Sequence, residues 1–186
     1  SILTKFILEK IKDFEKDVGS FVEKVNLITD AEYDLFSLSL KNKYNSNRIK
    51  DTDVVRLIND AKKLIIRNNK NCFILHILVD KYIVDGKEYF ELPENLDYKE
   101  FIIDLSFITV QNSIIKTLNR VLKDCNIEVK KIICHQYSSR FADKKDTSPC
   151  IAGKKVIEGI NSAEVITRNV YSKKQGLFEK MFNFFS

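Results

Sequence analysis

The run Phe73–Val84 (FILHILVDKYIV) constrains the fold more than any other stretch of this chain. Its first half is apolar on both sides of an extended backbone, a pattern typical of a strand rather than of a surface helix. The run ends at Asp85-Gly86, a residue pair that favours a tight turn. The chain is therefore predicted to contain a β-sheet that includes this long strand.

The first fifty residues are predicted to form a helix, two strands and a loop. Apolar residues recur at helical spacing over residues 2–18, and Gly19 then stands where a helix would stop. Polar and apolar residues alternate over Phe21–Ile28 and Tyr33–Leu40, which predicts two strands. The polar stretch Lys41–Lys50 (KNKYNSNRIK) is interpreted as a loop.

A second helix is expected directly before the long strand. Asp51, Thr52 and Asp53 offer side chains that cap helix N-termini. The residues that follow place apolar side chains on one stripe, which we expect to be buried: Val54, Val55, Leu57, Ile58, Ala61, Leu64 and Ile65.

Three further elements follow the long strand. Phe101–Val110 is predicted to be a strand with Phe101, Ile103, Leu105 and Phe107 on one face. Asn112 or Ser113 is expected to cap a helix, and Val129–Cys134 is expected to be a short closing strand. The apolar side of that helix comprises Ile114, Ile115, Leu118, Val121, Leu122 and Cys125.

The pattern weakens after residue 140. Asp143–Gly153 mixes charged residues with Ser, Pro and Gly without a period, which favours a loop or linker. The order of the elements predicts an α+β protein. We expect a two-layer module in which a small, mostly antiparallel sheet packs against helices, followed by a C-terminal amphipathic helix.

Composition excludes few classes of protein, but the distribution of charge disfavours nucleic-acid binding. The formal net charge is +5, and the lysines are spread between acidic residues. Such spacing is typical of a solvated surface rather than of a nucleic-acid groove, so no nucleic-acid partner is expected. The four cysteines form no CxxC pair, which favours a reducing, cytosolic compartment.

Residues with catalytic or metal-binding chemistry are sparse. His76 lies between apolar neighbours in the long strand, and His135 ends another strand; neither has a carboxylate or cysteine at metal-ligand spacing. Both are interpreted as core or edge histidines. Neither GxxxxGK[ST] nor GxGxxG occurs. We therefore expect no enzyme activity, no catalytic or nucleotide-binding residues, no metal and no cofactor.

The last eleven residues, 176–186 (GLFEKMFNFFS), have the composition of an amphipathic helix. On a helical wheel the large apolar residues share one side, and lysines lie beside the other side or just before the segment. This pattern predicts a helix that lies in an anionic lipid surface. The predicted membrane-binding residues are Leu177, Phe178, Met181, Phe182, Phe184, Phe185, Lys173, Lys174 and Lys180.

Three segments carry a family resemblance: Asp53–Lys63 (DVVRLINDAKK), Ile74–Gly86 (ILHILVDKYIVDG) and Gln111–Val129 (QNSIIKTLNRVLKDCNIEV). They resemble the inserted subdomain of FtsA, the family of actin-like bacterial cell-division proteins that tether FtsZ to the membrane. The C-terminal segment 176–186, called the tail below, is similar to the amphipathic C-terminal helix of that family. Two positions depart from the family pattern: Val79 or Asp80 stands where a proline is expected, and Asn126 where a glycine is expected.

The resemblance implies a division of the chain into four parts. Residues 1–50 correspond to a partial actin-like region, and residues 51–140 to the inserted subdomain. Residues 141–175 would be a linker, and residues 176–186 a membrane-targeting helix. The glycine-rich phosphate turns of an actin-like ATPase are missing, and Arg140–Gly153 stands in place of one of them. The nucleotide-binding core is thus expected to be largely absent, and ATP binding and direct FtsZ contact do not carry over.

The resemblance implies a scaffold of the cell-division machinery, at the cytoplasmic face of the inner membrane and at the septum. Its expected partners are anionic lipid, cell-division proteins with FtsZ as one candidate, and further copies of itself. Four alternatives remain: a tail that docks into its own domain, a PilM-type pilus scaffold, a small RNA-binding α+β protein, and an enzyme of unrecognised type.

Overall fold

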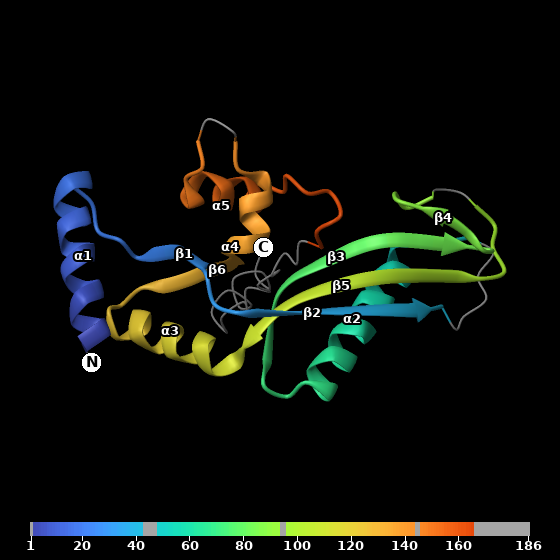
Figure 1. Ribbon diagram of the computed structural model, residues 1–186, viewed down its shortest axis with the longest axis horizontal. Coiled ribbons are helices and arrows are strands. Elements are labelled where there is room, and N and C mark those ends of the chain that lie inside the picture. Colours follow the sequence, from blue (N-terminus) through green and yellow to red (C-terminus); the bar gives the residue numbers. More distant parts are fainter. Residues whose placement is uncertain (1, 43–47, 94–95, 144–145, 166–186) are drawn as a thin grey trace, which may run out of the picture.

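Two separate sheets organise the chain. The computed structural model describes residues 2–42, 48–93, 96–143 and 146–165. Within them, four strands form a sheet in the order β2-β5-β3-β4, and two strands form a second sheet, β1-β6 (Figure 1). Helices pack on both sheets, which confirms the predicted α+β class.

The four-stranded sheet is antiparallel throughout. Its long strands are β2 (Tyr33–Lys41), β3 (Cys72–Val84) and β5 (Phe101–Gln111), all within two residues of the predicted ranges. The short strand β4 (Lys87–Tyr89) is an addition that the sequence pattern did not reveal. The predicted Asp85-Gly86 turn joins β3 to β4, and both turn residues have positive φ, 48° and 82°.

Helix α2 (Asp51–Asn68) covers one face of this sheet. Its apolar stripe meets the inward residues of β5, all four of which are fully buried as predicted. The prediction of a buried stripe is wrong for two residues, since Val55 is 55% exposed and Leu64 is 37% exposed. Both lie at the margins of the stripe, where a helix turns away from a flat sheet. At its start, the Asp53 carboxylate accepts the Lys50 backbone N–H at 3.3 Å.

The second sheet pairs β1 (Lys24–Thr29) with β6 (Glu128–Cys134) in parallel. Helix α3 (Asn112–Asp124) lies on one side of it, and the short helix α4 (His135–Ser138) and helix α5 (Pro149–Ile157) lie on the other (Figure 1). A 3-10 turn, Ser139–Phe141, follows α4. This end of the molecule thus has three layers, whereas the four-stranded sheet and α2 make two.

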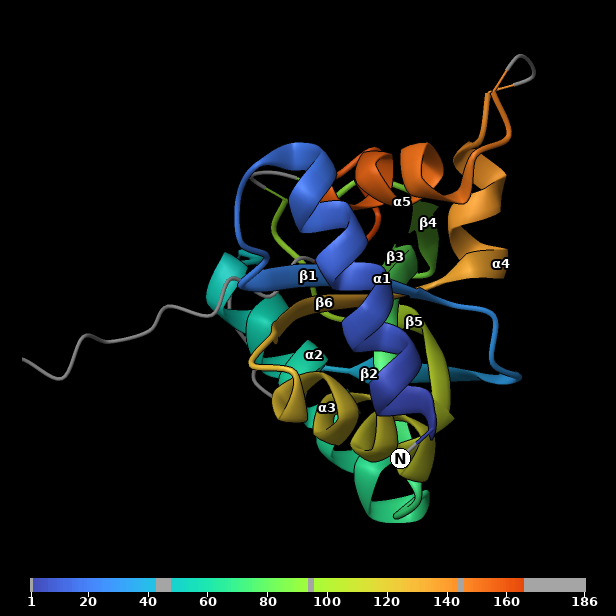
Figure 2. The ribbon, with the colours of Figure 1, turned by 90° about the vertical axis from the view of Figure 1, so that its left-hand side faces the viewer.

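Helix α1 (Ile2–Val18) lies at the outer end of the three-layered part, beside α3 (Figure 2). It ends where the sequence predicted, since Gly19 adopts φ 72° and its N–H donates to the Glu15 carbonyl at 2.8 Å. None of its residues is buried, and Phe6, Phe14 and Val18 are exposed. The helix is amphipathic, but α3 covers only part of its apolar side.

Helix α5 corrects the prediction of a loop over Asp143–Gly153 and of a linker over residues 141–175. Pro149 occupies the first turn, where its missing N–H costs nothing. Ala152, Gly153 and Val156 are buried against the second sheet. These small residues allow α5 to approach the second sheet closely. They also leave few large apolar residues at helical spacing, which is the pattern that predicts a helix from sequence.

The expected side-chain cap of α3 is also wrong. The N-cap residue is Gln111, and the structure gives it no side-chain capping bond. Asn112 instead donates its backbone N–H to the Asn71 carbonyl at 2.7 Å. The start of α3 is therefore held by the chain that enters β3, a contact between segments far apart in sequence.

Candidate interaction surfaces

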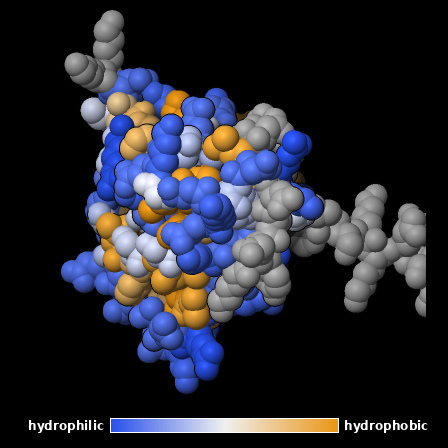
Figure 3. All heavy atoms as spheres, turned by 90° about the vertical axis from the view of Figure 1, so that its right-hand side faces the viewer, coloured by the Kyte–Doolittle hydropathy of each residue, from blue (hydrophilic) through white to orange (hydrophobic). Residues whose placement is uncertain are grey.

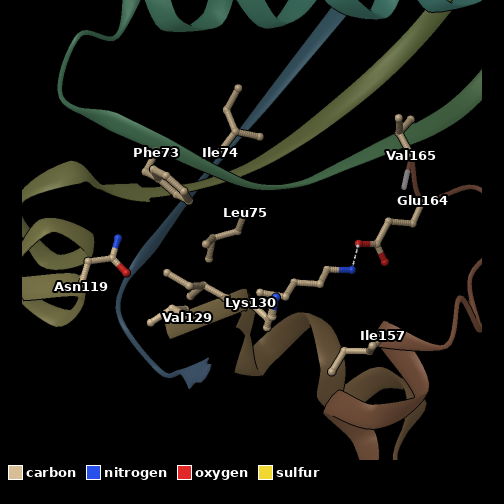
Figure 4. A pocket seen from close by; sticks show the side chains of 11 residues that line it. Phe73, Ile74, Leu75, Asn119, Val129, Lys130, Ile157, Glu164 and Val165 are labelled. Carbon is tan, nitrogen blue, oxygen red and sulfur yellow. Dashed lines mark hydrogen bonds and ion pairs between the residues drawn. The ribbon is translucent and has the colours of Figure 1, made fainter. Parts of the chain in front are cut away.

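A groove lies between the two sheets, where the first part of β3 faces β6 (Figure 4). We call it the inter-sheet groove; its volume is about 360 Å³. Figure 4 shows Phe73 and Leu75 on one wall and Val129 and Lys130 on the other. Its lining residues are Phe73, Ile74, Leu75, Asn119, Val129, Lys130, Lys131, Ile132, Ile157, Glu164 and Val165.

Glu164 lies at one end of the inter-sheet groove and is the centre of a buried polar network. Its Oε1 lies 2.9 Å from His76 Nδ1, and its Oε2 accepts the Tyr137 hydroxyl at 2.9 Å. Lys131 Nζ reaches Oε1 at 3.4 Å, and Asn161 Nδ2 donates to the Tyr137 hydroxyl at 3.0 Å. The Glu164 side chain is only 3% exposed, so these partners replace the water it has lost.

The protonation of His76 follows from its second contact. Its Nε2 accepts the backbone N–H of Cys134 at 3.0 Å, so the ring proton lies on Nδ1 and is donated to Glu164. Because His76 belongs to β3 and Cys134 ends β6, this imidazole joins the two sheets directly. Because both of its ring nitrogens are hydrogen-bonded within the fold, His76 has a structural role and is not placed to act as a catalytic base.

The network shifts the pKa values of Glu164 and of Tyr137. Burial by itself raises the pKa of Glu164, but the hydrogen bond from His76, aided by Lys131 and Tyr137, lowers that pKa below its ordinary value. The pKa of the Tyr137 hydroxyl is raised, first by burial and then by the neighbouring Glu164 carboxylate. At neutral pH the pair is therefore a carboxylate and a neutral phenol.

Sequence reasoning correctly placed His76 in the core but missed its carboxylate. His76 and Glu164 are 88 residues apart, so no local spacing could pair them. The available signal was the histidine itself, since a polar ring among apolar neighbours requires a hydrogen-bond partner somewhere in the fold. His135 is less buried, and its Nδ1 lies 3.3 Å from Asp30.

The second candidate surface is the free edge of β2. In the described part of the chain β2 pairs with β5 alone, over nine residue pairs without a bulge. Strand β3 lies between β5, which pairs with its whole length, and β4, which pairs with residues 82–84. The long open edge of the sheet is therefore β2. Regular edges of this length are sites where another strand can add.

A basic groove of about 410 Å³ runs beside that edge, between the end of β2 and α2. Leu40, Leu57 and Leu64 supply its apolar part. Four cationic side chains and one carboxylate surround them: Lys41, Arg56, Lys63, Arg67 and Asp60. Arg56 is held by Asn42 at 2.9 Å and by Asp53 at 2.8 Å, so its guanidinium is fixed in place.

The end of the molecule where β2 finishes and β4 lies is shown in Figure 3. Hydrophobic patches lie there among mostly hydrophilic side chains. Phe90, directly after β4, is exposed, and Leu35, near the start of β2 at the opposite end of that strand, is exposed as well. Isolated exposed apolar residues are ordinary on a protein surface, so the edge of β2 and its basic groove remain the more specific features.

The predicted membrane-binding residues lie outside the described residues. Lys173, Lys174, Leu177, Phe178, Lys180, Met181, Phe182, Phe184 and Phe185 all belong to residues 166–186. Among the helices that are described, none combines the length and the hydropathy needed to cross a bilayer. No cluster of three or more potential metal ligands occurs in residues 2–42, 48–93, 96–143 and 146–165.

No protein-family model matches the chain, and no curated protein matches it.

Proposed function

We propose that this chain is a scaffold of the bacterial cell-division machinery, similar to the inserted subdomain of FtsA, that recruits a partner at its β2 edge and is tethered to anionic lipid by residues 176–186. It would act on the cytoplasmic face of the membrane, at the septum. The elements α2, β3, β5, α3 and β6 follow one another in the order expected for the FtsA-like segments, with the short strand β4 added between β3 and β5. That agreement supports the proposal without identifying the partner.

The open edge of β2 is the observation that carries the recruiting role. Over nine residues without a bulge, alternate residues of β2 direct their backbone N–H and C=O groups to the open edge, where an added strand can pair with them. The adjoining groove supplies an apolar floor and four cationic side chains, three of which also pair with carboxylates of the chain: Lys41 with Glu100, Arg56 with Asp53 and Lys63 with Asp60. An extended partner segment with apolar and acidic residues fits both features, because its backbone can pair with β2 while its carboxylates face Lys63 and Arg67.

Charge also decides between such a partner and a second copy. Two β2 strands that pair antiparallel are related by a two-fold axis perpendicular to the sheet, so both α2 helices lie on the same face. The Lys63 and Arg67 side chains of the two copies would then approach each other. Repulsion between like charges disfavours this pairing, whereas an acidic segment neutralises them.

The membrane part of the proposal depends on the tail. A helix of eleven residues is too short to be stable in water, and we expect it to fold only on lipid. Each nearby lysine adds about 1 kcal/mol of attraction to an anionic surface. One tail binds reversibly, so several chains gathered by one partner would bind more tightly through effective concentration.

Localisation of a fluorescently tagged full chain in dividing cells tests both parts. We expect a septal signal for the natural sequence, a diffuse signal for the chain ending at Gln175, and a membrane signal without septal enrichment for Lys63→Glu/Arg67→Glu. Lys12→Glu/Lys16→Glu on α1 is the matched control, with the same spacing and charge change, and should remain septal. Septal enrichment of the α2 double variant would refute the β2 site.

Vesicle co-sedimentation isolates the tether. With vesicles of phosphatidylglycerol and phosphatidylcholine, the full chain should sediment, and the chain ending at Gln175 should stay in solution. Phe182→Glu should weaken sedimentation because it places a charge on the apolar side of the tail. Equal sedimentation of all three proteins would exclude the tail as the tether.

A further inference from the structure

Helix α1 packs against the rest of the described chain through one side. Two contacts fix that side: the Cys125 thiol meets the Thr4 carbonyl at 4.0 Å, and the Glu15 carboxylate accepts the Val22 N–H at 2.8 Å. The rest of the circumference of α1 faces outward at this end of the molecule (Figure 2). The half-buried residues of the packed side are Thr4, Ile7, Leu8, Ile11 and Glu15.

A second apolar side of α1 lies about a quarter-turn from the packed one. We call it the outer stripe; at roughly 100° per residue its members fall within about 120° of arc. They are Leu3, Phe6, Phe14 and Val18, and all four are exposed. Single exposed apolar residues are ordinary, but a stripe of them along one side of a helix marks an interaction surface.

The charges around the outer stripe are ordered. Lys10 lies within the stripe, with its ammonium 5.9 Å from the centre of the Phe6 ring and 4.0 Å from the Asp13 carboxylate. Asp13 and Asp17 lie toward the margin that is farther from the packed side. Both aspartates would meet like charges on an anionic lipid surface, so this order disfavours lipid as the occupant of the stripe.

We propose that the outer stripe of α1 binds the outer stripe of a second copy of this chain, with the two helices antiparallel. With Phe6 of one copy opposite Val18 of the other, Lys10 lies opposite Phe14 and within a helical turn of Asp13 and Asp17 of the second copy. Two-fold symmetry repeats the same attraction on the other side of the axis.

Charge also selects the direction of this pairing. In a parallel pair with the same residues opposite each other, Lys10 would face Lys10, and each aspartate would face its own counterpart. Repulsion between like charges disfavours that arrangement, whereas the antiparallel pair is complementary to itself. The outer stripe is therefore better suited to a second copy than to lipid.

The dimer should be weak and compatible with the β2 site. Two helices of 17 residues bury less surface than the roughly 1,600 Å² of a standard stable interface. We therefore expect a dissociation constant of about 10–100 µM. Helix α1 and the end of β2 lie at opposite ends of the molecule (Figure 1), so dimerisation leaves the edge of β2 and its basic groove open in both copies.

Sedimentation velocity of the full chain without lipid, over about 5–500 µM, tests the inference. The natural chain should shift from monomer to dimer as its concentration rises. Phe14→Glu should weaken the dimer at least about tenfold, because it places a carboxylate in the apolar contact. Val55→Glu on α2 is the matched control, since Val55 is 55% exposed and Phe14 56%, and it should dimerise like the natural chain. Circular dichroism should show all three proteins equally folded.

A charge exchange tests the antiparallel register. Lys10→Glu and Asp13→Lys/Asp17→Lys should each weaken self-association about fivefold or more. An equimolar mixture of these two variants should dimerise again, because the new carboxylate of one meets the new lysines of the other. Lys12→Glu/Lys16→Glu changes charges on the opposite side of α1 and should dimerise like the natural chain.

Three results would overturn the inference: a natural chain that stays monomeric throughout, undiminished dimerisation of Phe14→Glu, or a mixture that stays monomeric. Phe182→Glu separates the stripe from the tail and should dimerise like the natural chain. Loss of the dimer in this variant would assign self-association to the tail, which also overturns the inference. The inference does not depend on the proposed function, which is tested by septal localisation and vesicle binding.

Discussion

His76 donates a hydrogen bond to Glu164 at 2.9 Å, and this contact joins β3 to the last described segment of the chain. The other nitrogen of the same ring accepts the Cys134 N–H of β6. One buried imidazole therefore connects both sheets with residues 160–165. Glu164 makes three further contacts: it accepts a hydrogen bond from Tyr137, forms an ion pair with Lys131 and pairs with Leu78 in a backbone bridge.

Removing the Glu164 carboxylate should be strongly destabilising. Glu164→Ala leaves His76 and Tyr137 buried without their acceptor, so we expect the free energy of unfolding to fall by about 2–4 kcal/mol. Urea denaturation followed by circular dichroism measures this change. Glu158→Ala is the control, because that carboxylate is 61% exposed and its ion pair is with Lys154 of α5, the helix that ends just before it. It should cost less than about 0.5 kcal/mol.

Stability should depend on pH through Glu164. Its pKa in the folded chain is lowered, so the carboxylate contributes stability that is fully present above the ordinary glutamate pKa of about 4.3. This contribution is lost as the pH falls through the lower folded-state value. Glu164→Gln mimics the protonated form.

The difference in unfolding free energy between the natural chain and Glu164→Gln should therefore shrink as the pH is lowered from 7 to 3. Urea titrations at several pH values measure it. A constant difference over this range would mean that Glu164 does not titrate with a lowered pKa in the folded state.

Gly153 should not tolerate a methyl group, because an added Cβ would lie 2.6 Å from Ile28 Cδ1. Gly153→Ala should lower the free energy of unfolding by about 1–2 kcal/mol through overpacking between α5 and β1. Ile28→Val removes the methyl group that clashes. In that background, Gly153→Ala should cost less than about 0.5 kcal/mol. Equal costs in both backgrounds would show that Ile28 is not the obstacle.

Asp85 organises the turn after β3 with one oxygen. Its Oδ1 accepts the backbone N–H groups of Lys99 and Glu100, at 2.9 and 2.7 Å, and its φ is 48°. Asparagine retains an oxygen acceptor and tolerates positive φ, so Asp85→Asn should change thermal stability little, by less than about 0.5 kcal/mol. Asp85→Ala should cost about 1–2 kcal/mol, because it loses both bonds. Similar losses in the two variants would contradict this role.

Local patterns were sufficient for the long elements. The helices α1, α2 and α3 and the strands β2, β3 and β5 each present an apolar period over nine residues or more, and each appears within two residues of its expected start. Short elements were less visible. Strand β4 has only three residues, and α5 has small residues where it packs, so neither shows a clear apolar period.

Strand pairing and buried side-chain contacts could not be predicted in this way, because they depend on residues that are distant along the chain. The parallel partner of β6 is β1, more than one hundred residues earlier, and the acceptor for His76 lies 88 residues later. No spacing within a window of the sequence can encode such contacts. The same holds for the open edge of β2, which in the described part of the chain pairs with β5 alone.

The sequence by itself determined the inward face of β5 and most of that of α2, since apolar side chains leave water where the backbone period aligns them. It also determined the turn at Asp85-Gly86, where the two residues accept positive φ. The tertiary structure alone decided which strands are neighbours, which edge stays open and which carboxylate meets His76. The physical reason is that burial is non-directional, whereas strand pairing and buried hydrogen bonds require specific partners, and only the packed chain brings those partners together.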